Sequence, residues 1–264
     1  MPLEKNGKGT KKHIIKMRKP NFFVLGSGRC GTTSLYRMLK QHKDIFMSDI
    51  KEPNFFCSDF QVVKNPIDYF QLFSKCKNEK FIGEASHAYL SNPETPEVLH
   101  TLFPEAKFVL ILRNPTNRVY SLYRYVRRRG FEKNKFEKAI NIEEKRYKDE
   151  NFKRDCPHYF WNYMYVRSSY YDVQLKRYLN LFDRDRFCFV NLFELSNNPI
   201  QWIEYICDFL EISSLFHPKR IEYRNKAKYE KIDLKIKKML DEKFENTRIE
   251  TEKIVGRKMF LDKL

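Results

Sequence analysis

The sequence predicts an α/β fold, a single domain in which a mainly parallel central sheet is flanked by helices. Three observations predict it: apolar runs of four or five residues stop abruptly, stretches with helical spacing follow them, and no fixed-period repeat is visible. Strands that alternate with helices are typical of βαβ units, and the helices of such units cover both faces of the sheet.

Four apolar runs have the length of buried strands: residues 21–25, 80–83, 108–112 and 187–190. The first run stops at Gly26 and leads through a glycine-bearing loop into a helix. The third precedes a helix expected over 116–128, and the fourth precedes an amphipathic helix after Pro199. In such sheets, ligands bind at the carboxyl ends of the strands, near the point where the strand order reverses.

The other segments are expected to surround this sheet. Residues 1–20 are predicted to form a loose, flexible basic arm, and residues 21–264 the ordered domain. Segment 127–155 is charged and helix-prone and has no apparent strand, so we expect a surface insertion beside the site. A Lys-rich tail helix is expected to cover the core through the apolar residues Leu234, Ile236, Leu240 and Phe244.

Composition limits the classes of function. The 264 residues carry 51 Lys and Arg against 34 Asp and Glu, and this net charge of +17 attracts nucleic acid, acidic lipid, nucleotide or sulfated sugar alike. With 42% hydrophobic and 16% aromatic residues, the chain can bury a large core, which excludes wholesale disorder. No apolar run approaches the ~20 residues of a membrane helix, so no membrane span is expected.

The cysteines indicate the compartment. Six of them are scattered along the chain, with no CxxC pair and no spacing typical of zinc ligands, so no metal site is expected. The N-terminal segment is polar and basic and contains no apolar signal core. We therefore expect a reducing compartment, the cytoplasm.

A phosphate-binding loop is predicted between the first strand and its helix, at Gly26-Ser27-Gly28-Arg29-Cys30-Gly31-Thr32-Thr33-Ser34. Small residues let consecutive backbone N–H groups face an anion, and the helix N-terminus adds partial positive charge. The glycine spacing matches the nucleotide-binding P-loop, but the lysine that follows the second glycine there is missing. Arg29 lies inside the loop instead, and a guanidinium can bind two oxygens of a phosphate or sulfate without a metal. The domain is therefore expected to be P-loop-like.

A second anion site is predicted at the end of the run 108–112. Arg113 follows this run directly, and Ser121 lies eight residues further on, within the expected helix. An arginine at a strand tip can meet a serine from the second turn of the next helix, so we expect this pair to bind a second phosphate at some distance from the first. Arg118 is interpreted as a structural ion-pair residue and is left out of the site.

With these motifs in place, the sequence resembles the sulfotransferases that use 3′-phosphoadenosine 5′-phosphosulfate (PAPS). The branch it resembles most is that of the heparan sulfate sulfotransferases and their bacterial relatives. The resemblance rests on ordered segments at 28–35 (GRCGTTSL), 51–56 (KEPNFF) and 112–121 (LRNPTNRVYS), with shorter pieces at 83–86 and 255–257. It runs from about residue 21 to the tail, and ordered agreement at separated motifs is more specific than any one loop.

The resemblance implies in-line transfer of a sulfuryl group from PAPS to a hydroxyl or amine, with 3′,5′-ADP as the product. Glu52 matches the family's catalytic base, which removes the proton of the acceptor. Arg29 and Lys51 would stabilise the charge that develops on the leaving phosphate. A saccharide is one candidate acceptor.

The resemblance also implies which residues hold the donor. Its 5′-phosphosulfate end would lie on the loop residues Arg29, Cys30, Gly31, Thr32, Thr33 and Ser34. Its 3′-phosphate would lie on Arg113 and Ser121. Lys226 and Lys228 match a basic segment that helps to bind the 3′-phosphate and adenine, although the glycine expected there is absent.

One departure concerns catalysis. The heparan-type enzymes usually place a lysine where this chain has Ala85. His87 could substitute for it as a donor, although a lone histidine is more often a structural hydrogen-bonding residue. The basic segment 124–135 is a candidate contact for an acidic saccharide and could equally face solvent.

Two alternative functions stay open at this point. A P-loop nucleotide kinase is opposed by the missing loop lysine and by the lack of an apparent magnesium-binding aspartate after a strand. A non-catalytic basic module for nucleic acid or glycan is favoured by the net charge and by Arg127-Arg128-Arg129. No RNA-reading aromatic signature accompanies that charge, so no nucleic-acid partner is expected.

Overall fold

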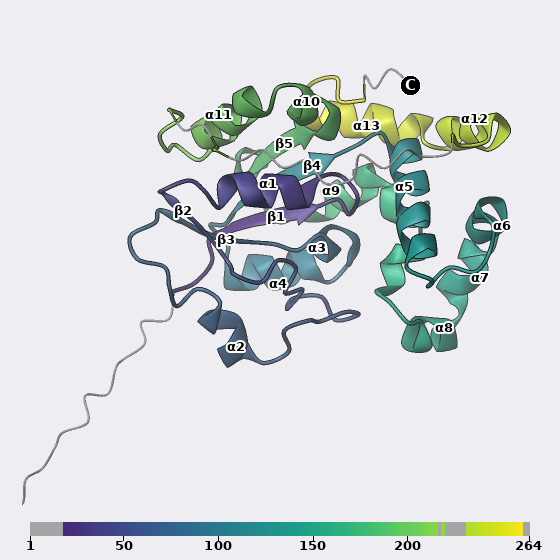
Figure 1. The fold of residues 1–264 in the computed structure, drawn as a ribbon, viewed down its shortest axis with the longest axis horizontal. Helices are drawn as coiled ribbons and strands as arrows, with labels where there is room; N and C mark the ends of the chain where they lie inside the picture. The colour runs from purple at the N-terminus through teal and green to yellow at the C-terminus, as the bar shows by residue number, and fades with distance from the viewer. Residues whose placement is uncertain (1–17, 216–217, 220–230, 261–264) are drawn as a thin grey trace, which may run out of the picture.

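A computed structural model describes residues 18–215, 218–219 and 231–260, and its centre is one sheet of five strands (Figure 1). All strand pairs are parallel, in the order β2-β3-β1-β4-β5. The strands are β1 (Phe22–Gly26), β2 (Ile45–Met47), β3 (Phe81–Ala85), β4 (Lys107–Leu112) and β5 (Phe187–Asn191). The expected α/β fold with a parallel sheet is thus confirmed.

The sheet contains one strand that the sequence did not predict. The strand β2 has only three residues, at the edge of the sheet, where Ile45 pairs with Phe81 and Met47 with Gly83. Three residues are too few to show an alternation, so this strand is defined by its pairing with β3. The four predicted runs became the other four strands, each within one or two residues at either end.

Alternate residues of each strand face opposite layers of the core. The side that includes Val24, Val109 and Ile111 packs against α1 (Thr32–Leu39) and α11 (Pro199–Phe209). The other side, with Phe23 and Phe108, packs against α3 (Ala88–Ser91), α4 (Thr95–Leu102) and α9 (Tyr171–Leu179). Both faces are therefore buried, as in other parallel sheets, and the edge at the carboxyl ends of the strands is left for a ligand.

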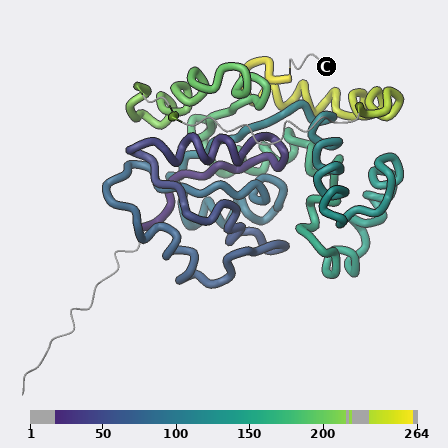
Figure 2. The backbone as a smooth tube through the Cα atoms, viewed as in Figure 1, coloured from purple at the N-terminus to yellow at the C-terminus, as the bar shows by residue number. Residues whose placement is uncertain are grey.

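The expected insertion beside the site is a group of short helices. The helix α5 (Pro115–Arg128) follows β4, and α6 (Phe136–Asn141), α7 (Glu143–Lys148) and α8 (Glu150–Asp155) lie beside it, away from the sheet (Figure 2). Two further helices complete the periphery, α2 (Pro66–Gln71) and α10 (Leu192–Asn197). Single 3₁₀ turns occur at Phe160–Asn162, Arg167–Ser169 and Arg184–Arg186.

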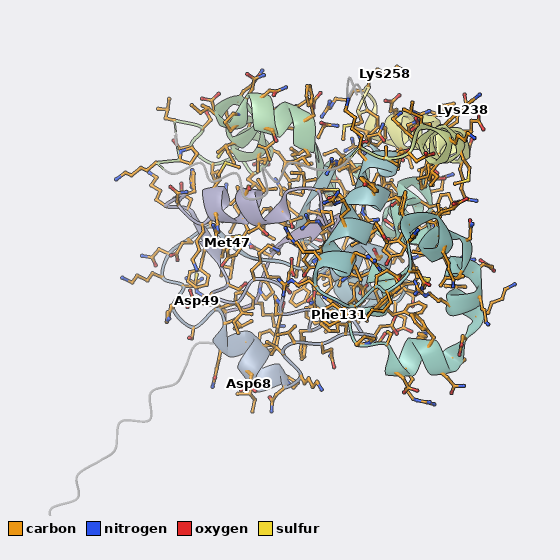
Figure 3. The ribbon with its side chains drawn as sticks, turned by 45° about the vertical axis from the view of Figure 1, so that its right-hand side comes forward. Met47, Asp49, Asp68, Phe131, Lys238 and Lys258 are labelled. Atoms are coloured by element: carbon orange, nitrogen blue, oxygen red, sulfur yellow. The ribbon has the colours of Figure 1, made fainter. Side chains whose placement is uncertain are left out.

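The tail forms two covering helices instead of one. The helix α12 (Leu234–Lys243) contacts α5, and α13 (Glu245–Val255) packs on α9. Of the predicted core residues, Leu240 and Phe244 are fully buried, but Leu234 is 80% exposed because it opens the helix at the rim. Lys238 and Lys258 lie on the outer surface of this layer (Figure 3). The basic arm 1–20 lies outside the described residues apart from its last three.

A buried ion pair joins the loop that follows α5 to α7 within the insertion. The Glu132 carboxylate, 1% exposed, accepts two hydrogen bonds from Arg146 at 2.6 and 3.1 Å and one from the Tyr165 hydroxyl at 2.9 Å. Burial alone would raise the pKa of Glu132, but the hydrogen bond from Arg146 and the other donors outweigh it and lower the pKa to about 2. Loss of this charge would leave the Arg146 guanidinium without its partner.

We expect Glu132→Gln to lower the free energy of unfolding by roughly 3 kcal/mol, because it breaks a buried pair and leaves one charge uncompensated. The stabilisation from Glu132 is complete above its ordinary pKa of 4.5 and is lost as the pH falls towards 2, since the folded-state pKa is the lower one. Urea unfolding at pH 7 measures the difference. Glu144→Gln, which removes an exposed pair with Arg167, serves as the control and should unfold like the parent protein.

Candidate active site

A cavity of about 860 Å³ lies at the carboxyl edge of the sheet. Residues that follow four different strands line it: Arg29 after β1, His87 after β3, Arg113 after β4 and Leu192 after β5. Four arginines line the cavity, namely Arg29, Arg113, Arg128 and Arg129, and the only carboxylate among its lining residues is Glu52. The electrostatic character of the cavity therefore suits an anion, as the strand-edge argument predicted.

The glycine loop between β1 and α1 has the geometry of an anion-binding turn. Gly31 caps α1 with a φ of +89°, and Arg29 has a φ of +71°, so the chain turns sharply at both positions. A Cβ on Gly31 would lie 2.6 Å from Leu192 Cδ1, so this position has no space for a side chain. Thr32 and Thr33 form the first turn of α1, whose N–H groups have no partners within the helix. Backbone donors are thus available at the cavity wall.

Arg118 binds this loop through hydrogen bonds as a structural residue, but the ion pair expected for it is not found among the described residues. Its guanidinium is 2% exposed and donates to the Gly28 carbonyl at 3.0 Å and to the hydroxyls of Ser168 and Ser169 at 2.8 and 2.6 Å. No carboxylate within the described ranges forms an ion pair with it. The charge of Arg118 is therefore not cancelled, and it adds to the positive potential beneath the loop.

The two predicted anion sites are joined through Arg29. Its Nε donates to Ser121 Oγ at 3.4 Å, and its guanidinium lies 4.9 Å from the centre of the Tyr125 ring on α5. Arg113 lines the same cavity from the end of β4. The loop arginine and the α5 serine, which the sequence assigned to opposite ends of the donor, are hence in contact in this structure.

Glu52 lies at the rim of the cavity in a cluster with two basic side chains. Its Oε1 accepts from Lys51 Nζ and from His87 Nδ1, the latter at 2.9 Å. Desolvation raises the pKa of Glu52, but the His87 and Lys51 contacts outweigh it and hold the pKa well below its ordinary range. The sequence predicted Glu52 and Lys51 as functional residues, and the structure brings both to one point with His87.

His87 connects this cluster to the glycine loop. A Cβ placed on Gly28 would lie 2.7 Å from His87 Cδ2, so the imidazole ring rests directly against the loop backbone. Burial lowers the pKa of His158, which also lines the cavity, and electrostatic interactions with His87 and Arg129 lower it further. His87 is thus the residue that brings the carboxylate cluster against the loop.

Two of the predicted site residues that the structure describes, Cys30 and Lys51, are not among the residues that line the cavity. Cys30 is fully buried beneath the loop, where its Sγ contacts the Tyr171 hydroxyl at 3.8 Å, and burial raises the pKa of its thiol. Its side chain therefore cannot reach a ligand in the cavity. Lys226 and Lys228 lie outside the described residues. Thr32, Thr33, Ser34, Gly31, Arg29, Arg113 and Ser121 all line the cavity, as expected from the sequence.

The cavity also contains residues that the sequence reasoning missed. Asn117 and Tyr125 lie four residues before and after Ser121 on α5, so helical spacing from Ser121 would have found them. Leu192, Phe193 and Ser196 follow β5, where the strand-edge rule predicts ligand contacts. His158 and Asn162 lie near a 3₁₀ turn far along the chain, and no local pattern marks them.

These features place the chain among P-loop-like α/β proteins with a positively charged cavity at the strand ends. Within that class it belongs to the sulfotransferase family, since the sulfotransferase domain family matches residues 19–258. This confirms the family that the sequence motifs indicated.

Individual relatives agree with this membership. The chain is similar to a sulfotransferase from Alicyclobacillus acidocaldarius of known crystal structure, with 29% identity and a TM-score of 0.79 over 91% of this chain and 97% of that chain. It is 27% identical to mouse heparan sulfate glucosamine 3-O-sulfotransferase 5 over 81% of this chain and 58% of that protein. It is 36% identical to the membrane-associated sulfotransferase kil1 of Dictyostelium discoideum over 40% of this chain and 23% of that protein.

The resemblance to heparan sulfate enzymes and bacterial relatives is thus confirmed, and nothing in these matches supports a nucleotide kinase or a basic binding module. The chain spans about a quarter to three fifths of the length of these two curated relatives. Over the described residues, no helix combines the length and apolar character needed to cross a membrane. In the same residues, no group of three or more His, Cys, Asp and Glu side chains could hold a metal ion.

The close contact of Gly28 with His87 generates a prediction. We expect Gly28→Ala to lower the free energy of unfolding by about 1–3 kcal/mol, because the new methyl group would overlap the imidazole ring. The same change in a His87→Ala background should cost far less, because the obstacle is gone. Thermal unfolding of the two single variants and the double variant measures this coupling. Equal losses with and without the His87 ring would contradict the packing described here.

Proposed function

We propose that this chain transfers a sulfuryl group from PAPS to a hydroxyl or amine of an acceptor, and that the acceptor is a saccharide. One observation carries the proposal. His87 contacts both the Gly28 backbone of the loop and the Glu52 carboxylate, so an anion-binding loop and an acid–base group from different strands share one cavity. Transfer of an anionic group to a neutral nucleophile needs both functions at one place.

The residues present fit PAPS as the donor. Arg29, Gly31, Thr32, Thr33 and Ser34 would hold its 5′-phosphosulfate end through a guanidinium, backbone N–H groups and hydroxyls. Arg113 and Ser121 would hold its 3′-phosphate. The Cys30 side chain takes no part in this assignment, and a contribution from Lys226 and Lys228 stays a prediction.

The proposed division of roles places proton transfer on Glu52. Bound PAPS supplies the sulfuryl group and leaves as 3′,5′-ADP. Glu52 accepts the proton of the attacking hydroxyl or amine as the new bond to sulfur forms. Arg29 and Lys51 stabilise the negative charge that appears on the leaving phosphate oxygen as its bond to sulfur breaks.

The low pKa of Glu52 bears on this role, because a carboxylate that accepts hydrogen bonds from Lys51 and His87 is a weak base. Lys51 and His87 are the groups that lower this pKa. An anion in the cavity attracts the same two side chains, and any weakening of their contacts with Glu52 raises its pKa and makes it a stronger base. Binding of PAPS would in this way raise the pKa of Glu52 and make it a stronger base at the time when the acceptor proton must be removed.

The acceptor end is proposed to lie on the side of the cavity formed by the helical insertion. Phe60 and His158 stack there with ring centroids 5.8 Å apart, and Arg128, Arg129 and Asn162 complete the wall. Aromatic faces with a few polar and cationic groups between them suit a saccharide that carries negative charge. Arg127 has a different role, since its guanidinium donates to the carbonyls of Glu132, Lys133 and Asn134 and closes a turn.

We also propose a reducing, cytoplasmic setting, which the six unpaired cysteines support. The Dictyostelium relative is described as membrane-associated, so fractionation of the native cells is the relevant measurement.

The central prediction separates donor binding from turnover. We expect Glu52→Gln to keep its affinity for 3′,5′-ADP while kcat falls on the order of 10²–10⁴-fold, because the amide cannot accept the proton. Titration calorimetry measures the affinity, and mass spectrometry of acceptors incubated with PAPS measures the added sulfate. Full turnover by this variant would remove Glu52 from the role of base.

Arg113→Ala is the matched control for the donor site. The parent protein should bind 3′,5′-ADP more tightly than 5′-AMP, and this preference should disappear in the variant because the 3′-phosphate loses its cation. If the parent protein itself does not distinguish the two nucleotides, the assignment of PAPS as the donor is wrong.

The arginines of the insertion give a separate prediction for the acceptor. We expect the double variant Arg128→Ala, Arg129→Ala to raise the KM for an acidic saccharide on the order of tenfold, with the KM for PAPS changed much less. Arg127→Ala should lower thermal stability instead and leave the acceptor KM unchanged, because its guanidinium is bound to backbone carbonyls. An acceptor KM that is the same in all variants would place the acceptor elsewhere.

A further inference from the structure

A carboxylate that has no role in the proposed chemistry lies directly behind the site. Glu84, on β3, is fully buried and accepts hydrogen bonds from three hydroxyls: Tyr69 at 2.7 Å, Ser86 at 2.6 Å and Tyr89 at 2.9 Å. No basic side chain in the described parts of the chain forms an ion pair with it. Burial raises the pKa of Glu84 to about 7, against the effect of these three donors. A buried charge held by hydroxyls alone is costly, which points to a specific use.

Two of these hydroxyls also bind the segment that carries Glu52. The backbone N–H of Asn54 donates to Ser86 Oγ at 3.1 Å, and the N–H of Phe56 donates to the Tyr89 hydroxyl at 3.3 Å. The Tyr69 hydroxyl differs, because among the described residues it is bonded to Glu84 and to no N–H of this segment. Glu84 is therefore connected to the Glu52 segment by two hydrogen-bonded routes. The Tyr69 hydroxyl provides no such route, although the Tyr69 ring stacks on Phe55 with centroids 4.5 Å apart.

The segment has a backbone that needs such anchoring. Glu52 and Asn54 have φ values of +66° and +49°, in the left-handed region that residues other than glycine rarely adopt. Such conformations persist when the surroundings determine them. The N–H of Glu52 itself donates to the Ala85 carbonyl at 3.0 Å, the next residue after Glu84. These three hydrogen bonds, from the N–H groups of Glu52, Asn54 and Phe56, are made to Ala85 at the end of β3 or to hydroxyls that bind Glu84 on β3.

The charge of Glu84 determines which group donates in the hydrogen bonds of the Ser86 and Tyr89 hydroxyls. Above its pKa of about 7, the Glu84 carboxylate is ionised and only accepts, so the Ser86 and Tyr89 hydroxyls must point their hydrogens at it and keep their lone pairs for the N–H groups of the segment. An amide at position 84 presents a donor to one of the hydroxyls, which then loses the partner for its own hydrogen. A neutral side chain of the same shape thus disturbs the order of the whole network.

We propose that Glu84 is a positioning residue that, through Ser86 and Tyr89, holds the segment 52–56 so that Glu52 meets His87. This inference rests on the proposed role of Glu52 as the base. Glu84 touches neither the donor nor the acceptor and acts only through these two hydroxyls. A shift of about 1 Å in a catalytic group can reduce the rate on the order of 10²-fold, so loss of the network should be visible in turnover.

The test compares hydroxyls that do or do not accept a hydrogen bond from the segment, and Tyr69→Phe keeps the ring that packs on Phe55. Ser86→Ala and Tyr89→Phe each remove a route from Glu84 to the segment, whereas Tyr69→Phe removes a hydroxyl that binds Glu84 alone. We expect the first two to lower kcat at saturating PAPS by on the order of ten- to a hundredfold, with the affinity for 3′,5′-ADP within about twofold of the parent. Tyr69→Phe should lower the melting temperature about as much as Ser86→Ala and Tyr89→Phe do. Its kcat should stay near that of the parent protein. Glu84→Gln, where it folds, should behave like Ser86→Ala.

A second readout is independent of turnover. The pKa of Glu52, followed by carbon NMR of its carboxyl group, should lie below its ordinary value in the parent protein and in Tyr69→Phe. It should rise towards 4.5 in Ser86→Ala and Tyr89→Phe, because Glu52 is no longer held against His87 and Lys51.

The outcomes separate this inference from the proposed function. If Ser86→Ala, Tyr89→Phe and Tyr69→Phe change kcat and the Glu52 titration equally, the network is merely structural and the inference is overturned. If the titration moves as expected but the parent protein does not transfer sulfate, the positioning stands and the proposed function falls. If neither kcat nor the titration changes in Ser86→Ala and Tyr89→Phe, Glu84 does not position Glu52, whatever reaction the protein performs.

Discussion

The parallel pairing of β1 with β3 on one side and with β4 on the other is the constraint on which the site depends. Parallel strands end at the same edge, so the glycine loop, residues 84–87 and Arg113 emerge together, although His87 follows Arg29 by 58 residues and Arg113 follows His87 by 26. The helices on the two faces bury the sheet and leave this edge open. The cavity is thus a consequence of topology before any side chain is considered.

Electrostatics then determines what the cavity can hold. Arginines line it, and the buried guanidinium of Arg118 lies beneath the loop without a carboxylate partner in the described residues. Such an arrangement is unfavourable when no anion is near, and the hydrogen bonds from Arg118 to Gly28, Ser168 and Ser169 compensate only part of that cost. The favourable state of this region is therefore one with bound negative charge. The Lys51 ammonium pairs with Glu52 and His87 contacts the same carboxylate oxygen, which reduces the repulsion between Glu52 and that charge.

Much of the fold and half of the site could be predicted from the sequence, because those parts depend on local patterns. Apolar runs predicted four strands, and the glycine motif predicted the loop residues that line the cavity. The short edge strand β2 could not be predicted, since its pairing with β3 defines it. The direction of a side chain within a tight turn is likewise not a local property, which is why Cys30 was assigned to the ligand although it lies in the core. The partners of Arg118 and His87 come from distant segments, and one sequence does not reveal them.

Two of the loop glycines, Gly28 and Gly31, differ in what excludes a side chain from each position. At Gly31 the obstacle is Leu192 from beyond β5, and at Gly28 it is the His87 ring from beyond β3. At Gly31 the φ of +89° also disfavours a side chain, so a smaller residue at 192 would not by itself permit a substitution there. Position 28 has no such backbone restriction, so natural variants at 28 should arise together with a change at 87, and this pair records ancestry that a single position would not preserve.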